Sequence, residues 1–147
     1  MFLSIRNPGV ADPASFTLLG ASGTRFANQA GTQGFFGSGA KNAIARLLRS
    51  NTSVTIMPGT HKMEFYSKPK PIKGQIFNQV CVKSSDSSIP KELGFTLEWG
   101  VADWKTDMMA FREFVANAID GAILSGGSYR DVIIDVVDKP RAKSGYT

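Results

Sequence analysis

The sequence contains one cysteine and one histidine among its 147 residues, Cys81 and His61. A single cysteine cannot form an internal disulfide, and these two residues are too few for a tetrahedral zinc site. No serine or cysteine nucleophile motif accompanies His61, so we expect no catalytic triad. These absences fit a protein of the reducing cytoplasm that is stabilised by its hydrophobic core.

Long apolar runs are also absent. No stretch of 18 apolar residues occurs, so we expect no membrane span. The opening MFLSIRNPGV lacks the apolar core and the small-residue cleavage site of a signal peptide. The composition, with 42% hydrophobic and 20% charged residues, is that of a soluble globular protein, and the length predicts one domain over residues 1–147. The ending SGYT directly follows a predicted strand, which suggests truncation at the C-terminus.

Acidic residues are scarce in the first part of the chain. Residues 1–91 contain 11 Lys/Arg and 3 Asp/Glu, whereas residues 92–147 contain 6 and 9. The net charge of +5 is therefore concentrated in the first part, where it favours binding of phosphate in a nucleotide or a nucleic acid. A solvated, lysine-rich surface is the alternative interpretation.

One basic stretch, HKMEFYSKPKPIKG, interleaves Phe65 and Tyr66 with Lys68, Lys70 and Lys73. Nucleic-acid-binding surfaces combine aromatic and basic side chains in this way. The same lysines, with two prolines, also fit an exposed and stiffened hairpin connection. Nucleic-acid binding through the basic half is therefore an alternative function.

The pattern of apolar residues predicts an α+β fold. A helix is expected to start at Asp12-Pro13, and a second helix, AKNAIARLLRSN, to stop at Asn51. Four strand-like runs follow, SVTIMPG, KMEFYSK, GQIFNQVCVKS and GFTLEWG, and then a long helix over 103–124 and a buried last strand within YRDVIIDVVDKP. We expect a two-layer sandwich, with the helices on one face of a mostly antiparallel sheet.

A glycine-rich segment over residues 20–40 leads into the second helix. It ends in GFFGSGAKNA, in which glycines allow backbone N–H groups to approach a phosphate, and a helix N-terminus favours the anion. The loop is neither a Walker A motif nor a dinucleotide fingerprint. A flexible connector that ends in a helix cap is the alternative.

The long helix contains FREFVANAID. Glu113, Asn117 and Asp120 stand at i, i+4 and i+7 and fall within about 60° of one another on its surface. A second, apolar stripe is expected to pack on the sheet and comprises Met109, Ala116, Ile119 and Ile123. The alternative to a site is a solvated acidic face on a core helix.

Together the two motifs resemble the GHKL nucleotide-binding superfamily, which includes gyrase subunits, heat-shock chaperones, histidine kinases and mismatch-repair ATPases. REFVANAIDGA resembles its N box, GFFGSGAKNAIARLL its second glycine box at the end of the ATP lid, and LLGASGTRF its lid entry. The sequences of these motifs look closest to those of bacteriophage-encoded members of the superfamily. The resemblance implies a Bergerat-type fold that binds ATP and Mg²⁺ in the cytoplasm (the host cytoplasm if phage-encoded), with residues 20–40 as a mobile lid.

The resemblance also implies roles for individual residues. Glu113 would be the general base, Asn117 the Mg²⁺ ligand, and Asp120 a support for the metal-bound waters or a basic partner. The phosphates would be held by the loop and helix start, comprising Gly34, Gly37, Ser38, Gly39 and Lys41.

Two features depart from the family pattern. The N box follows the glycine box instead of preceding it, which a circular permutation would explain. No DxGxG first glycine box is found, and RNPGVADP is at best a remnant, with Asn7 and Asp12 out of place. The resemblance covers about residues 18–49 and 103–137. We therefore expect an ATP- and Mg²⁺-binding domain compatible with slow hydrolysis, and the alternative is a non-enzymatic, phage-encoded interaction protein that acts on a host factor.

Overall fold

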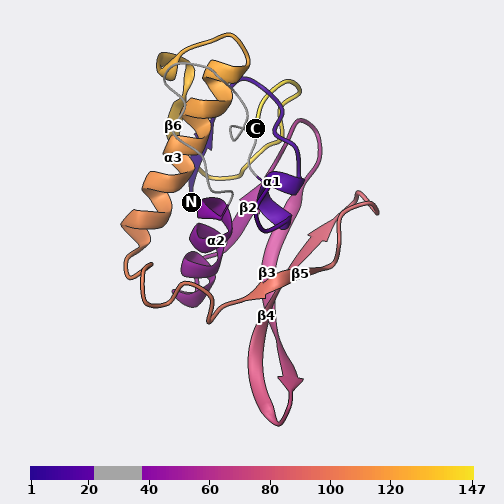
Figure 1. The fold of residues 1–147 in the computed structure, drawn as a ribbon. Coiled ribbons are helices and arrows are strands. Elements are labelled where there is room, and N and C mark those ends of the chain that lie inside the picture. Colours follow the sequence, from indigo (N-terminus) through magenta and orange to yellow (C-terminus); the bar gives the residue numbers. More distant parts are fainter. Residues whose placement is uncertain (22–37) are drawn as a thin grey trace.

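Two antiparallel sheets and three α-helices make an α+β fold in the computed structural model, which describes residues 1–21 and 38–147 (Figure 1). The α-helices are α1 (Ala14–Thr17), α2 (Gly39–Arg49) and α3 (Asp107–Leu124), and a short 3₁₀ helix, η1, spans Tyr129–Asp131. The strands are β1 (Phe2–Arg6), β2 (Val54–Ile56), β3 (Met63–Ile72), β4 (Gln75–Ser84), β5 (Glu92–Thr96) and β6 (Ile133–Val137). In these ranges no helix has the length and apolarity to cross a bilayer.

The larger sheet has the strand order β2-β3-β4-β5, with every neighbouring pair antiparallel. These are the four predicted strand runs, and the short connections between them join neighbours as expected. The core is the face of this sheet covered by α1 and α2, where the main buried side chains include Phe16, Ile44, Ile56, Met63, Phe65, Val80, Val82, Leu93 and Phe95. The predicted antiparallel α+β architecture is confirmed to this extent.

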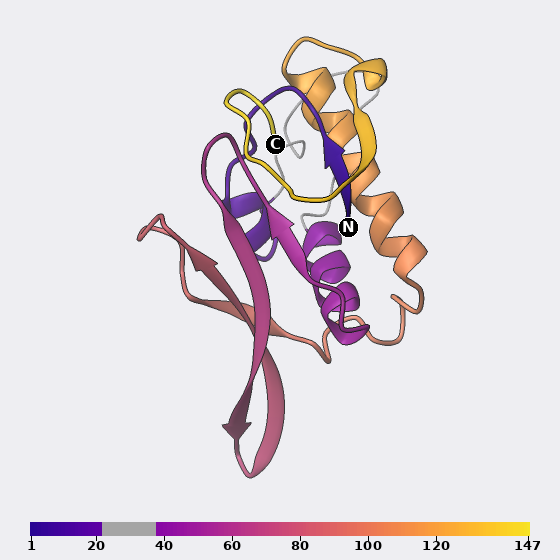
Figure 2. The same ribbon diagram turned by 180° about the vertical axis from the view of Figure 1, so that it is seen from behind.

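Helix α2 lies between the larger sheet and α3 (Figures 1 and 2). Its residues 40–45 are all buried, which covers every side of the helix, because the sheet lies on one side and α3 on another. The helix ends as predicted, since Asn51 adopts a positive φ of 63° just beyond the last turn. The burial of α2 on all sides explains how its polar residues Lys41 and Asn42 come to be enclosed.

Helix α3 packs against α2 and β1 instead of lying directly on the larger sheet. The predicted apolar stripe is therefore wrong in part, since Met109 is exposed. The buried positions of α3 are Ala110, Ala118, Asp120 and Ala122. Small residues allow two helices to approach closely. Of the polar residues that seemed to border the core-facing side, Glu113 lies against Gly39 of α2 and Asp120 is buried.

A second sheet pairs β1 with β6, two strands from opposite parts of the chain. The sequence did not predict β1, and it predicted burial for β6. That prediction is wrong: Ile134 is 47% and Val136 59% exposed, and among the described residues β6 pairs with β1 alone. Beyond the sheet, the backbones of Asn7 and Thr147 exchange two hydrogen bonds of 3.1 Å.

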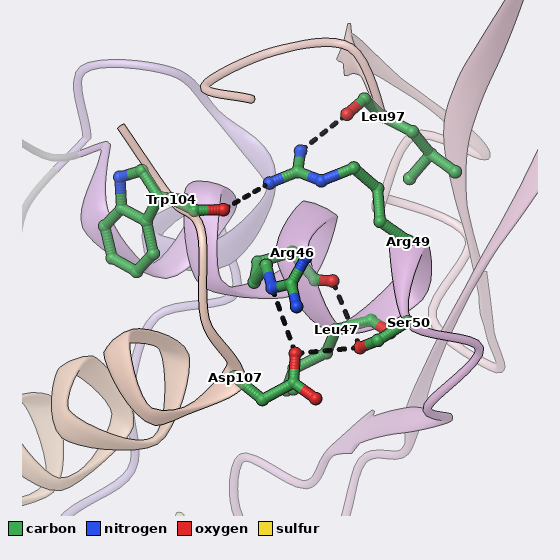
Figure 3. Close-up of polar contacts among 7 residues, drawn as sticks. All are labelled: Arg46, Leu47, Arg49, Ser50, Leu97, Trp104 and Asp107. Carbon is green, nitrogen blue, oxygen red and sulfur yellow. Dashed lines mark hydrogen bonds and ion pairs between the residues drawn. The ribbon is translucent and has the colours of Figure 1, made fainter. Parts of the chain in front are cut away.

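A polar cluster fixes the start of α3 to the end of α2 (Figure 3). The Arg49 guanidinium donates hydrogen bonds to the backbone carbonyls of Leu97 (2.6 Å), Trp99 (3.0 Å) and Trp104 (3.1 Å). Next to it, the Asp107 carboxylate accepts a hydrogen bond from Ser50 Oγ (2.9 Å) and forms an ion pair with Arg46 (3.0 Å). The segment between β5 and α3 is thereby held against α2.

Candidate functional site

The start of α2 brings the described part of the glycine motif to the interface with α3. Ser38 occupies the N-cap position, with φ −115°, and its carbonyl accepts the first helical hydrogen bond from Asn42 N (3.0 Å). Its side chain makes no capping hydrogen bond to the first turn of the helix. Gly39 and Lys41 follow in the first turn. Gly34 and Gly37 of the predicted phosphate loop, with most of the predicted lid over 20–40, lie outside the described residues.

The Glu113 carboxylate of α3 lies directly against Gly39 of α2. A Cβ placed on Gly39 would overlap with Glu113 Oε1 and would lie 2.8 Å from Oε2. Any larger residue here would force the carboxylate to move. The glycine motif and the acid–amide–acid motif, far apart in the sequence, therefore meet at one interface.

Replacement of Gly39 with alanine tests this contact. The added Cβ must displace the Glu113 carboxylate, which is the movable end of a flexible side chain, so we expect Gly39→Ala to lower the free energy of unfolding by about 1 kcal/mol, the low end of the range for overpacking. Gly94→Ala is a matched control, because nothing lies within 4 Å of its added Cβ. Urea denaturation would measure both. If the contact is the cause, Glu113→Ala should remove most of the penalty in the double variant, and an unchanged penalty would contradict it.

Asn117 lies one helical turn beyond Glu113 and bonds to it. Asn117 Nδ2 donates to Glu113 Oε1 at 3.2 Å. Because the two polar atoms of an amide lie on opposite sides, this bond directs Asn117 Oδ1 away from the carboxylate. The predicted base and the predicted metal ligand are thus held in a defined mutual orientation.

The environment of Glu113 favours its neutral form. Burial raises the pKa of this carboxyl above its usual 4.5, and the negative charge of Asp120 raises it further, while the Asn117 hydrogen bond and Lys41 act in the opposite direction. A carboxyl with a raised pKa is suited to accepting a proton near neutral pH. A merely solvated acid would not be shifted in this direction.

The raised pKa predicts a pH-dependent effect of Glu113→Gln on stability. Below about pH 4.5 the carboxyl is protonated in both the folded and unfolded chain, and glutamine imitates that neutral form. As the pH rises through the raised pKa, the folded chain must ionise a partly buried group and loses stability that the variant keeps. We expect Glu113→Gln to melt at a higher temperature than the parent at pH 7, with a difference that vanishes towards pH 4. A difference independent of pH would contradict this account.

Lys41 and Asp120 are charged but enclosed, with exposed fractions of 1% and 3%. Lys41 Nζ donates a hydrogen bond to the Ala21 carbonyl (2.9 Å), which ties α2 to the segment just before residue 22. Both charges act on Glu113, so the three groups share one electrostatic environment. Burying charged groups is costly unless they are paired, and such clusters are common at functional sites.

Asn7, which from the sequence belonged only to a motif remnant, packs against α3 next to the position of Asp120 in the helix. It is buried after β1, and its side chain lies so close to Gly121 that a Cβ there would overlap with Asn7 Nδ2. Gly121 directly follows Asp120, so the RNPG segment borders the acidic end of the site. The two glycines of this region, Gly9 and Gly121, were the available sequence signal for such close packing.

Asp12, the other residue of the remnant, is exposed and accepts a hydrogen bond from Ala14 N at the start of α1 (2.9 Å).

The donor set limits the kind of metal site that the interface can form. Across residues 1–21 and 38–147, no group of three or more His, Cys, Asp or Glu side chains is placed to hold a metal ion. A complete protein-only site is therefore not formed by these residues. The Asn117 oxygen does suit a hard cation such as Mg²⁺, which commonly takes one or two protein ligands and completes its shell with phosphate oxygens and water. The residues present fit a metal that is carried with a phosphate ligand.

Comparison with known proteins adds no relative to this picture. No protein-family model matches the chain, and no curated protein or solved structure is significantly similar to it.

Proposed function

We propose that the chain is an ATP- and Mg²⁺-binding domain of GHKL type, with its motifs in permuted order, that supports slow ATP hydrolysis. The observation that carries the proposal is the contact of the Glu113 carboxylate with Gly39. It joins the two motifs on which the family resemblance rests. A solvated acidic helix face would not be expected to seat its carboxylate against the first turn of a buried helix.

In this proposal α2 provides the phosphate-binding side. The N-terminus of α2 offers backbone N–H groups and a positive dipole end, and Ser38, Gly39 and Lys41 stand there. Lys41 contributes a positive charge in a low-dielectric setting, where its attraction to phosphate is strong. Gly34, Gly37 and the lid over 20–40 remain predictions from the sequence.

Helix α3 provides the groups for the metal and for the attacking water. Asn117 Oδ1 would hold Mg²⁺, and when bound the metal would neutralise charge on the phosphates. Glu113 would orient the water and accept its proton, a role that suits its raised pKa. Asp120 would support the metal-bound waters or balance Lys41 from its buried position beside Glu113.

Calorimetric titration with ATP, with and without Mg²⁺, tests the proposal. We expect saturable one-site binding that is tighter with Mg²⁺, since the metal would link Asn117 to the phosphates. Absence of binding in both conditions would contradict the proposal. It would support the second candidate function described next.

A non-enzymatic interaction protein is the second candidate, and the same contact favours it in one respect. The Glu113 carboxyl group already occupies a position at the first turn of α2, where a bound ligand would otherwise lie. In that case the contact fixes α2 to α3 and no ligand is needed. The two candidates differ in the outcome of the titration.

Variants of Asn117 and Lys41 separate metal from phosphate recognition. We expect Asn117→Ala to weaken ATP binding about tenfold or more in Mg²⁺, on the scale of changes at metal sites, and to have little effect without the metal. Lys41→Met keeps most of the buried stem but removes the charge, so it should weaken binding in both conditions. Titration calorimetry of folded variants would measure this, with Lys105→Ala on the exposed segment before α3 as a control. Equal affinities in all variants would place the site elsewhere.

A further inference from the structure

The β3–β4 hairpin extends beyond the body of the protein as a two-stranded arm, which we define as residues 67–78 (Figures 1 and 2). On one side, β2 pairs with β3 only from Met63 to Phe65. On the other side, β5 pairs with β4 at Gln79 and Cys81. The hairpin therefore continues past both neighbouring strands, and its outer part has no backbone pairing with a third described strand of the sheet.

The arm is built to be stiff. Ten residue pairs, from Met63↔Ser84 to Ile72↔Gln75, run without a bulge. The tip is a two-residue turn in which Lys73 has φ 49° and Gly74 φ 79°, and positive φ at both positions is what a type I′ turn requires. This turn matches the twist of the strands, so the arm holds its shape without outside support.

The β3 edge of the arm is a poor template for a further strand. Pro69 and Pro71 share the odd-numbered positions of Met63 and Phe65, whose backbones face β2. Backbone groups of a strand alternate in direction, so both prolines remove N–H groups from the free edge. An added strand would find no donor at Pro69 or Pro71, and Ser67 is the remaining odd-numbered donor of the arm on this edge. The exposed side chains of the arm are therefore the better indication of its partner.

The side chains of the arm are basic and lack acidic residues. Lys68, Lys70 and Lys73 lie in residues 67–78 with no Asp or Glu among them. Lys68 and Lys70 share a strand face with the exposed Ile72. Ile76, at 72% exposure, adds an apolar group near the tip on the opposite face, which it shares with Pro71. Projecting lysines between apolar contacts fit a polyanion whose surface also offers apolar groups.

We propose that the arm is a nucleic-acid-binding element that inserts into the major groove of duplex DNA. That groove is wide enough for a two-stranded β-ribbon, its walls carry phosphates for lysines, and its floor carries base edges and thymine methyl groups for apolar side chains. The arm has the matching form, charge and exposed apolar tip. This inference is independent of the nucleotide site.

Glu92 of β5 holds the two inner lysines when no DNA is bound. Its carboxylate forms ion pairs with Lys68 (2.5 Å) and Lys70 (2.8 Å), and these two lysines lower the pKa of Glu92 to about 2, so it is ionised at neutral pH. It therefore occupies the position that a phosphate would take between them. DNA binding exchanges this carboxylate for phosphates, and removal of its charge should strengthen binding.

Fluorescence anisotropy with a labelled 20-base-pair duplex tests the arm at several salt concentrations. For the parent chain we expect non-specific affinity of about 10⁻⁶–10⁻⁴ M, weakening steeply with salt. The triple change of Lys68, Lys70 and Lys73 to alanine should weaken binding at least about tenfold and reduce the salt slope by roughly 2–3, because each lysine neutralises about one phosphate. Glu92→Gln should strengthen binding several-fold, and Lys105→Ala should change neither quantity.

Several outcomes would overturn the inference. These are no binding by the parent, an unchanged slope in the triple variant, or weaker binding by Glu92→Gln. Stronger binding to a single-stranded oligonucleotide of equal length would contradict insertion into a groove. Equal binding to vesicles containing anionic lipid would show general attraction to negative charge. Circular dichroism of each variant would verify folding, which these exposed substitutions should preserve.

Discussion

Glu113→Gln should lower ATP turnover by about 10²-fold or more while leaving MgATP affinity close to that of the parent chain. Glutamine keeps the size of the side chain and can still bond to Asn117, but it cannot accept a proton. The loss is the usual scale for removal of a general base. Steady-state phosphate release and calorimetry on the same preparations would measure the two quantities.

Glu64→Gln provides a matched control for this experiment. Glu64 is also an acid, but it lies on β3 and forms an ion pair with Lys62, away from α2 and α3. It should leave turnover unchanged. If Glu113→Gln hydrolyses ATP like the parent, Glu113 is not the base, and its contact with Gly39 has a structural role only.

Arg49→Ala should lower the free energy of unfolding by about 3 kcal/mol. Arg49 donates to three backbone carbonyls in the segment that joins β5 to α3, and hydrogen bonds from charged donors contribute about 1.5–3 kcal/mol each when protected, less where solvent reaches them. Alanine removes all three bonds and leaves that segment without its link to α2. For a chain of this size the change corresponds to a melting temperature lower by roughly 6–12 °C.

Two further variants identify the source of the Arg49 effect. Arg49→Lys keeps the charge but not the planar fork that reaches several carbonyls, so it should retain only a part of the stability. Arg112→Ala removes an exposed arginine of α3 and should change stability by about 0.5 kcal/mol or less. Urea denaturation of all three would decide the point. An Arg49→Ala variant as stable as Arg112→Ala would mean that solvent replaces the three bonds at no cost.

Local sequence signals predicted the elements whose neighbours are close in the chain. The 3–4 spacing in AKNAIARLLRSN and the stop at Asn51 predicted α2, and four β-rich runs with short connections predicted the larger sheet. β1 was missed because FLSIR is short and its partner, β6, lies at the far end of the sequence. The same fact explains the wrong prediction of burial for β6, since its apolar composition does not reveal how many strands and layers will surround it.

The candidate site, like the fold, was predictable from the sequence only where the residues are close together in the chain. The relative positions of Glu113, Asn117 and Asp120 on one helix follow from helical geometry alone. Their placement against Gly39 and Lys41 depends on which helix α3 packs against, and periodicity does not encode that choice. Met109 seemed the better core residue by hydrophobicity, but the small residues Ala110, Ala118 and Ala122 are the apolar residues of α3 that are buried. The expectation that these two motifs meet came from their resemblance to a pair of family motifs, and the local pattern alone would not have predicted it.

The pairing of β1 with β6 also has a consequence for the order of folding. Phe2 pairs with Val137, so this sheet closes a loop that contains nearly all of the other elements. Contacts between residues so distant in sequence form slowly, because the loss of chain entropy precedes any gain from the contact. The hairpins of the larger sheet involve only local loops and can assemble first. The strand that places Asn7 against Gly121, the residue after Asp120, is therefore among the last parts to be fixed, and this end of α3 gains its neighbour only when the chain has closed on itself.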